Sequence, residues 1–354
     1  MNLPQHGSNP IHVYRSLNID PPARILDFSV NTNPLGPPAF IKERWHEYLH
    51  AIRDYPDPEA SVLINTLSKA NELPPDWLLP GNGAAELIAA VSQELKGEKV
   101  LIIEPAFSEY RRALEAQGAD IEAHVLSAEN NWELDEQIFE KMTEKKALFI
   151  CSPNNPTGKS YTVSVLAEVV KRAEKNGTLV VCDEAFYDFT EKAETLAPML
   201  RNFSNLIILR SLTKMYAIAG LRLGYMMASP PVIARIKSLL PHWNVNALAQ
   251  VIGTDCISDG THAERTRHFI ANERRRMHQL LTDMGFCVYP SSTNYYLLRP
   301  VKRAELYVIL AKRGIITRHT ENFAGLEGGF LRVAVKLRHE NDEFIDALKE
   351  WATC

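Results

Sequence analysis

Residues 206–224 read LIILRSLTKMYAIAGLRLG, an apolar run followed by a short polar segment. The apolar run predicts a buried β-strand over 206–210. Ser211 stands three residues before Lys214, and Arg222 stands eight residues after it. Because the stretch is otherwise nearly uncharged, we expect Lys214 to be buried, with a lowered pKa that makes its amine a nucleophile able to form a Schiff base. A lysine with no such context is more often a solvated surface charge.

The sequence before this stretch alternates between strand and helix patterns. Apolar runs at 99–103, 147–151 and 178–182 predict three more buried strands. Amphipathic helical spacing occurs at 84–95, 107–117 and 162–175. This alternation predicts an α/β fold with a mostly parallel sheet and helices on both of its faces.

After about residue 230 the pattern changes to long polar-rich helices and short strands. Helices are predicted at 230–240, 245–257, 261–284 and 340–352, and strands at 287–289, 295–299 and 330–335. We therefore expect an N-terminal segment (1–30) that packs on the small domain and the active site, a large cofactor-binding domain (31–240) and a small C-terminal α+β domain (241–354).

Composition limits the classes of partner. The 354 residues carry a net charge of −4, which gives no reason to expect nucleic acid or an anionic membrane as partner. No apolar signal core opens the chain, and no apolar run approaches the ~18 residues of a membrane span. Five scattered cysteines without zinc or redox spacing indicate reduced thiols in a cytoplasm and no metal site.

Special residues follow several of the predicted strands and helix starts. In open α/β sheets, ligands bind beyond the carboxyl ends of the strands. Asn82-Gly83-Ala84 opens a predicted helix, where backbone N–H groups can bind a phosphate, although such a sequence is more often a simple turn. Phe107 follows a strand and could stack on a flat heterocycle, or it could belong to the core.

Two further strand ends carry polar side chains. Asn155 lies in a loop fixed by prolines on both sides, where its amide could donate to a phenolic oxygen. Asp183 ends a buried strand, where a carboxylate is costly without a partner such as a pyridinium N–H. The alternative for Asp183 is a helix N-cap.

Taken in order along nearly the whole chain, these motifs resemble the fold-type-I enzymes that depend on pyridoxal 5′-phosphate (PLP), the aspartate aminotransferase superfamily. The resemblance implies a PLP-dependent transferase fold whose large domain has a mostly parallel seven-stranded sheet. It implies that Lys214 holds PLP, that Asp183 pairs with the pyridine nitrogen and that Asn155 bonds the phenolic oxygen. It also implies stacking by Phe107 and a phosphate site formed by Asn82, Gly83, Ala84, Ser211 and Arg222.

Two more roles come from the same resemblance. Tyr55, in a proline-rich segment, matches a tyrosine that reaches the phosphate of the neighbouring subunit, which implies a homodimer with shared active sites. Arg332 matches the arginine that binds the substrate α-carboxylate, a task that suits the planar guanidinium.

Within the superfamily, two families resemble this chain best: L-threonine-O-3-phosphate decarboxylases and histidinol-phosphate aminotransferases. The N-terminal segment with His6, the segment from Asn33 to Gly36 and the C-terminal segment with Arg318 resemble the decarboxylases. The resemblance implies that His6, Asn33, Gly36, Asn155, Arg318 and Arg332 bind a phosphorylated amino acid. Ser8 departs from the decarboxylase pattern, His6 could be an exposed tail residue, and Arg318 could be a surface cation.

The expected reaction is decarboxylation of L-threonine O-3-phosphate to (R)-1-aminopropan-2-yl phosphate and CO₂ in cobalamin biosynthesis. The alternative is a histidinol-phosphate or related aminotransferase that uses 2-oxoglutarate. Phe186 stands where aminotransferases commonly carry a tyrosine that donates to the phenolic oxygen, so one aminotransferase signature is missing. A regulatory module that binds PLP is a remote alternative. Such a regulator needs a DNA-binding domain ahead of its PLP domain, and the cofactor motifs of this sequence already begin by Asn31.

Overall fold

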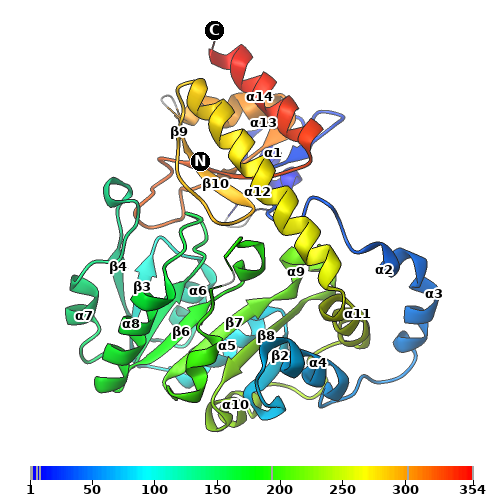
Figure 1. Cartoon of the computed structure of the whole chain (residues 1–354). Helices are drawn as coiled ribbons and strands as arrows, with labels where there is room; N and C mark the ends of the chain where they lie inside the picture. The colour runs from blue at the N-terminus through cyan, green and yellow to red at the C-terminus, as the bar shows by residue number, and fades with distance from the viewer. Residues whose placement is uncertain (1–2, 5–6, 8, 193, 301–302, 353–354) are drawn as a thin grey trace.

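The computed structural model describes residues 3–4, 7, 9–192, 194–300 and 303–352. A seven-stranded sheet forms the lower part of the molecule in Figure 1, and a smaller unit that contains both ends of the described chain lies above it. The helix α12 (Gly260–Asp283) runs from the smaller unit down to the sheet layer.

The large sheet has the order β2-β8-β7-β6-β5-β3-β4. Its strands are β2 (Leu78–Asn82), β3 (Lys99–Glu104), β4 (Asp120–Val125), β5 (Ala147–Cys151), β6 (Leu179–Asp183), β7 (Leu206–Ser211) and β8 (Leu223–Ala228). The strands β7, β6, β5, β3 and β4 are parallel, whereas β8 is antiparallel to both of its neighbours. The mostly parallel seven-stranded sheet is therefore confirmed.

Alternate residues of the strands pack on opposite layers. Val100 and Ile102 of β3 belong to one core cluster, whereas Leu101 and Ile103 belong to the other. The first layer contains α5 (Ala84–Glu94), α6 (Glu109–Ala116) and α10 (Pro230–Lys237); the second contains α4 (Ser61–Asn71), α8 (Val163–Lys175) and α11 (Ala247–Ser258). Apolar residues fill both faces because each parallel strand is covered on both sides.

The smaller unit joins segments from the two ends of the chain. Its four-stranded antiparallel sheet has the order β12 (Arg318–His319), β13 (Leu331–Ala334), β10 (Tyr295–Arg299) and β9 (Cys287–Val288). The short strand β1 (Leu26–Asp27) pairs in parallel with β11 (Ile315–Ile316). The helices α1 (Pro10–Leu17), α13 (Arg303–Lys312) and α14 (Arg338–Ala352) lie in the same upper part, and the Tyr14 hydroxyl donates to the carbonyl of Ala311.

Several elements were not predicted from the sequence. They are β1, β2, β4, β8, β11, β12, α1, α4, α13 and the short helices α2 (Ala39–Glu43), α3 (Trp45–Tyr48), α7 (Gln137–Lys141) and α9 (Leu212–Met215). The division of the chain at residues 30 and 240 stays a proposal.

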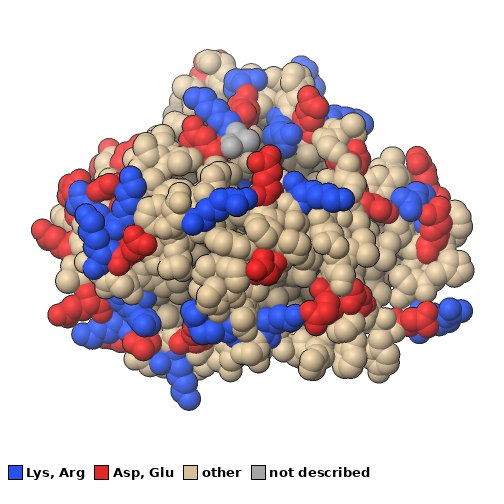
Figure 2. Space-filling model, turned by 60° about the horizontal axis from the view of Figure 1, so that its bottom comes forward, with Lys and Arg blue, Asp and Glu red and all other residues tan. Residues whose placement is uncertain are grey.

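The surface drawn in Figure 2 carries both signs of charge, with basic and acidic side chains interspersed. Over the part of the chain that the structure describes, no helix has the length and apolar character needed to cross a membrane. Within the same residues, no group of three or more His, Cys, Asp or Glu side chains is placed to hold a metal ion.

Candidate active site

A cavity of about 240 Å³ lies beyond the carboxyl ends of β3, β5, β6 and β7 and reaches the smaller unit. Because the carboxyl ends of parallel strands meet at one edge, residues far apart in the sequence come together there. The predicted residues that line this cavity are Gly83, Ala84, Phe107, Asn155, Asp183, Ser211, Lys214, Arg222, Arg318 and Arg332. Most of the residues predicted for the site therefore lie around a single cavity.

Lys214 lies on α9, directly beyond the end of β7. Its Nζ donates to Ser211 Oγ at 3.0 Å, and its ammonium lies 5.7 Å from the centre of the Phe186 ring. Burial lowers the pKa of Lys214, and the nearby Asp183 partly opposes this shift. The amine is therefore unprotonated at a lower pH than an exposed lysine, as a nucleophile requires.

Asn33 supports the backbone around Lys214 rather than lining the cavity. Its N–H donates to the Lys214 carbonyl at 2.9 Å, and its side-chain amide donates to the carbonyl of Met215 at 2.8 Å. Gly36 closes the following turn with a φ of 75°, in which its N–H donates to the Asn33 carbonyl. The substrate contacts expected for Asn33 and Gly36 stay predictions.

Asp183 lies at the end of β6 and is buried. One of its oxygens accepts from the Tyr110 hydroxyl at 2.5 Å, and the other accepts from the Ala185 N–H at 2.8 Å. Burial raises the pKa of Asp183, and the Tyr110 hydrogen bond opposes that shift. A carboxylate has about four acceptor positions, so both oxygens can still accept a further N–H from the cavity.

Tyr110 was missed by the sequence reasoning, although its spacing gives a signal. It stands three residues after Phe107, which precedes α6, and the Tyr110 N–H donates to the Phe107 carbonyl at 3.2 Å. The two rings meet edge to face with their centres 5.8 Å apart. Tyr110 therefore contacts both the predicted stacking residue and the predicted partner of the ring nitrogen.

A candidate anion site lies at the opposite end of the cavity. The helix α5 begins at Ala84, and its first N–H groups have no partners within the helix. Gly83 has a φ of 77°, and a Cβ there would lie 2.6 Å from Arg222 Nη2, so only glycine lets the guanidinium pack against this helix end. Ser211 Oγ lies 2.7 Å from Thr213 Oγ1, and both residues line the cavity.

Asn82 lies beside this anion site without lining the cavity. Its backbone N–H donates to Glu86 Oε2 at 2.7 Å, and the residue is exposed. Its predicted phosphate contact stays a prediction, whereas Thr213 is an additional hydroxyl at the site that the sequence reasoning did not single out.

Two buried arginines form the wall that the smaller unit contributes. Arg318 on β12 and Arg332 on β13 are register partners, with exposed fractions of 4% and 6%. Burial lowers the pKa of Arg332 to about 10; burial and the charge of Arg332 lower that of Arg318 to about 9. Two cations held together in this way give this wall a strong positive potential.

Among the described residues, Arg332 donates to neutral oxygens. Its Nη1 donates to Asn155 Oδ1 and its Nη2 donates to the Ser29 carbonyl at 2.7 Å, while its buried Nε has no hydrogen-bond partner among the described residues. Because Arg332 donates to Asn155 Oδ1, the amide nitrogen is the atom of the Asn155 side chain that can donate a hydrogen bond to another group. Arg332 lines the cavity, and a buried guanidinium whose hydrogen bonds among the described residues go to neutral oxygens is suited to bind an anion.

The N-terminal segment covers this wall. Gly7 lines the cavity and packs so closely on Ser29 that a Cβ would lie 2.7 Å from its carbonyl oxygen. The Pro4 carbonyl lies 2.7 Å from His319 Nε2, and burial lowers the pKa of His319 to about 4. His6 itself lies outside the described residues, and its substrate contact stays a prediction.

Tyr55 does not line the cavity within this chain. Its side chain is 84% exposed, and its ring centre lies 5.2 Å from that of Trp243. An exposed tyrosine is expected if the residue completes the site of a neighbouring subunit, as the sequence predicts.

These groups fit PLP because each chemical feature of that cofactor meets a complementary group. The phosphate suits the N-terminus of α5 with Ser211 and Arg222, and the pyridine nitrogen suits Asp183. The aldehyde suits the amine of Lys214. The fold and this cavity together define a PLP-dependent enzyme of fold type I.

Comparison with known proteins identifies the family. The model of the aminotransferase class I and II family matches residues 23–348, and the chain belongs to this family. The threonine-phosphate decarboxylase of Salmonella typhimurium is 35% identical over 98% of this chain and 96% of its own length. The cofactor of the chain is accordingly PLP.

Two solved structures show the same fold. The histidinol-phosphate aminotransferase of Clostridium acetobutylicum has a TM-score of 0.87 and is 32% identical, covering 93% of this chain and 99% of its own. The histidinol-phosphate aminotransferase of Sinorhizobium meliloti, solved in complex with PLP, has a TM-score of 0.86 at 20% identity and covers 98% and 95%.

Proposed function

We propose that this enzyme decarboxylates L-threonine O-3-phosphate to (R)-1-aminopropan-2-yl phosphate and CO₂, a step of cobalamin biosynthesis. The observation that carries the proposal is the pair of buried arginines, Arg318 and Arg332, opposite each other on β12 and β13 in the same cavity as Lys214. A substrate with two anionic groups a few bonds apart offsets the burial of both guanidinium groups. Threonine phosphate has such groups, a carboxylate and a phosphate.

Binding at two points would control which bond of the substrate reacts. When bound, PLP supplies an electron sink, and the bond at Cα that is aligned with its π orbitals is the one weakened. Arg332 would hold the α-carboxylate, and Arg318 would hold the phosphate. Together they would fix the rotation about the nitrogen–Cα bond. Decarboxylation requires that this rotation place the carboxylate in the aligned position, and transamination requires the hydrogen there. Lys214 lies in the same cavity and can move a proton at Cα.

Phe186 supports the decarboxylase over an aminotransferase. It is buried, packs edge to face on Tyr295 with ring centres 5.0 Å apart and lines the cavity beside Lys214. Its ring cannot donate a hydrogen bond to a phenolic oxygen, so Asn155 is the side-chain donor predicted for that atom.

A product assay tests the proposal. Purified holoenzyme is incubated with threonine phosphate without any oxoacid, and both CO₂ and aminopropanol phosphate are measured. The expected result is equal amounts of the two products. Turnover of histidinol phosphate that depends on 2-oxoglutarate, with no CO₂ released from threonine phosphate, would overturn the proposal and leave the PLP site intact.

The second candidate is a histidinol-phosphate aminotransferase that uses 2-oxoglutarate. The fold likeness to the Clostridium acetobutylicum enzyme favours it. The same two arginines could also hold the two carboxylates of 2-oxoglutarate. The assay above separates the two reactions, because only the aminotransferase requires an oxoacid.

We also propose that the enzyme is a homodimer with shared active sites. Large apolar side chains are exposed on α3, on the short helix η1 (Leu49–Ile52), on α11 and in the segments that follow η1 and precede α11. They include Trp45, Leu49, Ile52, Tyr55, Trp243 and Val251. Mixing Tyr55→Phe chains with Lys214→Ala chains should give hybrid dimers in which one site collects both defects and the other is intact. A fully active monomer in sedimentation would contradict this.

A further inference from the structure

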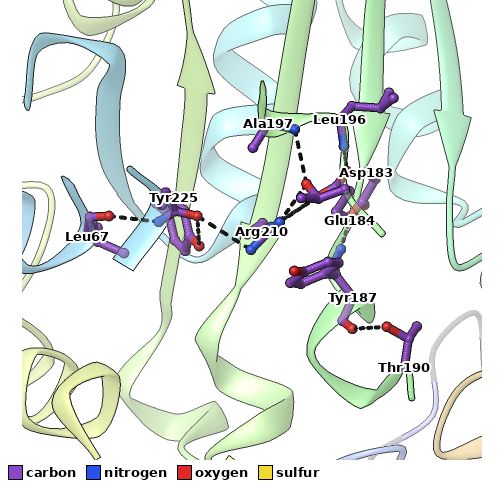
Figure 3. A network of polar contacts seen from close by, with 12 residues as sticks. Leu67, Asp183, Glu184, Tyr187, Thr190, Leu196, Ala197, Arg210 and Tyr225 are labelled. Atoms are coloured by element: carbon purple, nitrogen blue, oxygen red, sulfur yellow. Dashed lines mark hydrogen bonds and ion pairs between the residues drawn. The ribbon is translucent and has the colours of Figure 1, made fainter. Parts of the chain in front are cut away.

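A buried ion pair lies directly behind the cofactor cavity. Asp183 ends β6 and Glu184 follows it; Ser211 ends β7 and Arg210 precedes it. Side chains alternate between the faces of a strand, so Glu184 and Arg210 point away from the cavity that Asp183 and Ser211 line. Figure 3 shows Glu184 and Arg210 facing each other, with Asp183 next to Glu184 in the chain.

The pair is almost completely enclosed and fully bonded. Arg210 Nε and Nη2 both donate to Glu184 Oε2, at 3.0 and 2.8 Å, and the two side chains are 7% and 3% exposed. The Thr195 hydroxyl donates to the same oxygen at 2.7 Å, and the Leu196 N–H donates to Glu184 Oε1 at 3.0 Å. Such geometry is required before a buried ion pair can offset its desolvation.

The network also ties together the elements that carry the cofactor residues. The Arg210 guanidinium lies 3.6 Å from the centre of the Tyr187 ring, so the loop after β6 is held against β7. Its Nη1 reaches Asn71 at the end of α4, which also accepts from the Tyr225 hydroxyl on β8. These contacts, on the side of the strands that faces away from the cavity, therefore stabilise the register of β6 and β7.

We propose that Glu184 and Arg210 are a positioning pair for the cofactor: they fix Asp183 relative to Ser211 and Lys214, and they keep the charge next to Asp183 neutral. This inference rests on the proposed roles of Asp183 and Lys214. Neither member of the pair lines the cavity, so both act through the residues beside them in the chain.

The charges around Asp183 show why neutrality matters. Tyr110 from α6, Lys214 from α9 and Cys151 from β5 face Asp183 across the cavity wall, and Glu184 adjoins it on its own strand. The charge of Glu184 raises the pKa of Asp183. Arg210 itself is surrounded by Glu184, Asp188, Tyr187 and Tyr225. Removing one member of the pair leaves an unbalanced charge of known sign near the cofactor.

Removing the positive charge of Arg210 and removing the negative charge of Glu184 should shift the pH midpoint of the holoenzyme absorbance in opposite directions. The measurement is the pH midpoint of the absorbance of the holoenzyme, which reports the proton on the nitrogen that joins Lys214 to the cofactor. Arg210→Met leaves the negative Glu184 and should raise the midpoint by on the order of half a pH unit, whereas Glu184→Gln leaves the positive Arg210 and should lower it similarly. The double variant Glu184→Gln/Arg210→Met should return close to the wild-type midpoint.

Controls separate positioning from simple loss of stability. Glu273→Gln changes a buried carboxylate that accepts from Arg276 and Asn341 and does not line the cavity, and it should lower the melting temperature without moving the midpoint. Arg210→Lys keeps the charge and should keep the midpoint if Arg210→Met does not fold.

Either of two results would overturn the inference: shifts in the same direction for both single variants, or wild-type midpoints with only the melting temperature lowered. Failure of the proposed cofactor roles would look different. In that case borohydride reduction of the wild-type holoenzyme would not attach the cofactor to Lys214, whatever the pair variants do.

Discussion

Buried arginines occur in two regions of this protein, and their surroundings differ in kind. Arg210, behind the sheet, is bonded to the carboxylate of Glu184. Burial acts to lower its pKa, but the nearby acidic groups outweigh this effect and raise it. Arg332, in the cavity wall, donates to the neutral oxygens of Asn155 and Ser29, and burial lowers its pKa to about 10.

The difference shows how one residue type serves two purposes. A buried cation that is balanced within the chain stabilises a fixed arrangement of strands. A buried cation that faces a cavity without an acidic partner among the described residues retains its attraction for an external anion. We propose that the first arrangement holds the cofactor end of the site in place and that the second binds the substrate at the other end.

The largest expected effect tests whether this cavity is the reacting site at all. Lys214→Ala should abolish turnover, because the side chain that would attach the cofactor and move the proton is gone. Reduction of the wild-type holoenzyme with borohydride, followed by peptide mapping, should place the adduct on Lys214. An adduct on another lysine would move the site away from both arginine regions.

The next effect concerns the carboxylate at the cofactor end. Asp183→Ala should reduce turnover by roughly 10²–10⁴-fold, because a buried charge that loses its partner costs about 3–5 kcal/mol. Steady-state kinetics at saturating PLP measures the loss. A drop of less than tenfold would mean that Asp183 only caps the loop after β6 through the Ala185 N–H.

A direct comparison of the two regions uses the same substitution in each. Arg210→Met leaves Glu184 buried and unpaired, so it should lower the free energy of unfolding by about 3–5 kcal/mol. Arg332→Met leaves only neutral acceptors and should lower it by no more than about 1–3 kcal/mol, while impairing the use of threonine phosphate and threonine alike. Denaturant unfolding and kinetics are measured on both variants. If Arg210→Met and Arg332→Met lowered the free energy of unfolding equally, the proposed difference between the two buried arginines would be wrong.

The smallest effect resolves the two cavity arginines from each other. Arg318→Ala should weaken the use of threonine phosphate by about 1.5–3 kcal/mol and narrow its advantage over threonine, which lacks the phosphate. The ratio of kcat/KM for the two substrates measures this advantage. If the ratio does not change, Arg318 does not bind the phosphate.

The cofactor end could be predicted from the sequence because local rules govern it. The strands β3, β5, β6 and β7 have apolar centres, and ligands of such sheets bind where parallel strands end. Asp183 ends β6, Phe107 and Lys214 each stand three residues after the end of a strand, and all three line the cavity. The edge strand β4 was missed because only half of its residues are apolar. The strand β8 was missed because only short helical turns separate it from β7, so the alternation of strands with long helices does not mark it.

The other end depended on resemblance because its geometry is not local. Nothing in the sequence around Arg318 or Arg332 indicates that two-residue and four-residue strands place them opposite each other. The same holds for Asn33, which the structure places beneath Lys214, and for the Tyr110 hydroxyl on Asp183. The Glu184–Arg210 pair likewise becomes visible only when β6 and β7 lie side by side.

The hydrogen bond from Arg332 to the Ser29 carbonyl joins residues 303 positions apart in the chain. The strand pair β1–β11 and the ion pair between Arg24 and Glu343 span similar separations. During synthesis, the sheet and Lys214 leave the ribosome well before β12 and β13 do. A nascent chain could therefore complete its cofactor end while the wall with Arg318 and Arg332 is still being translated.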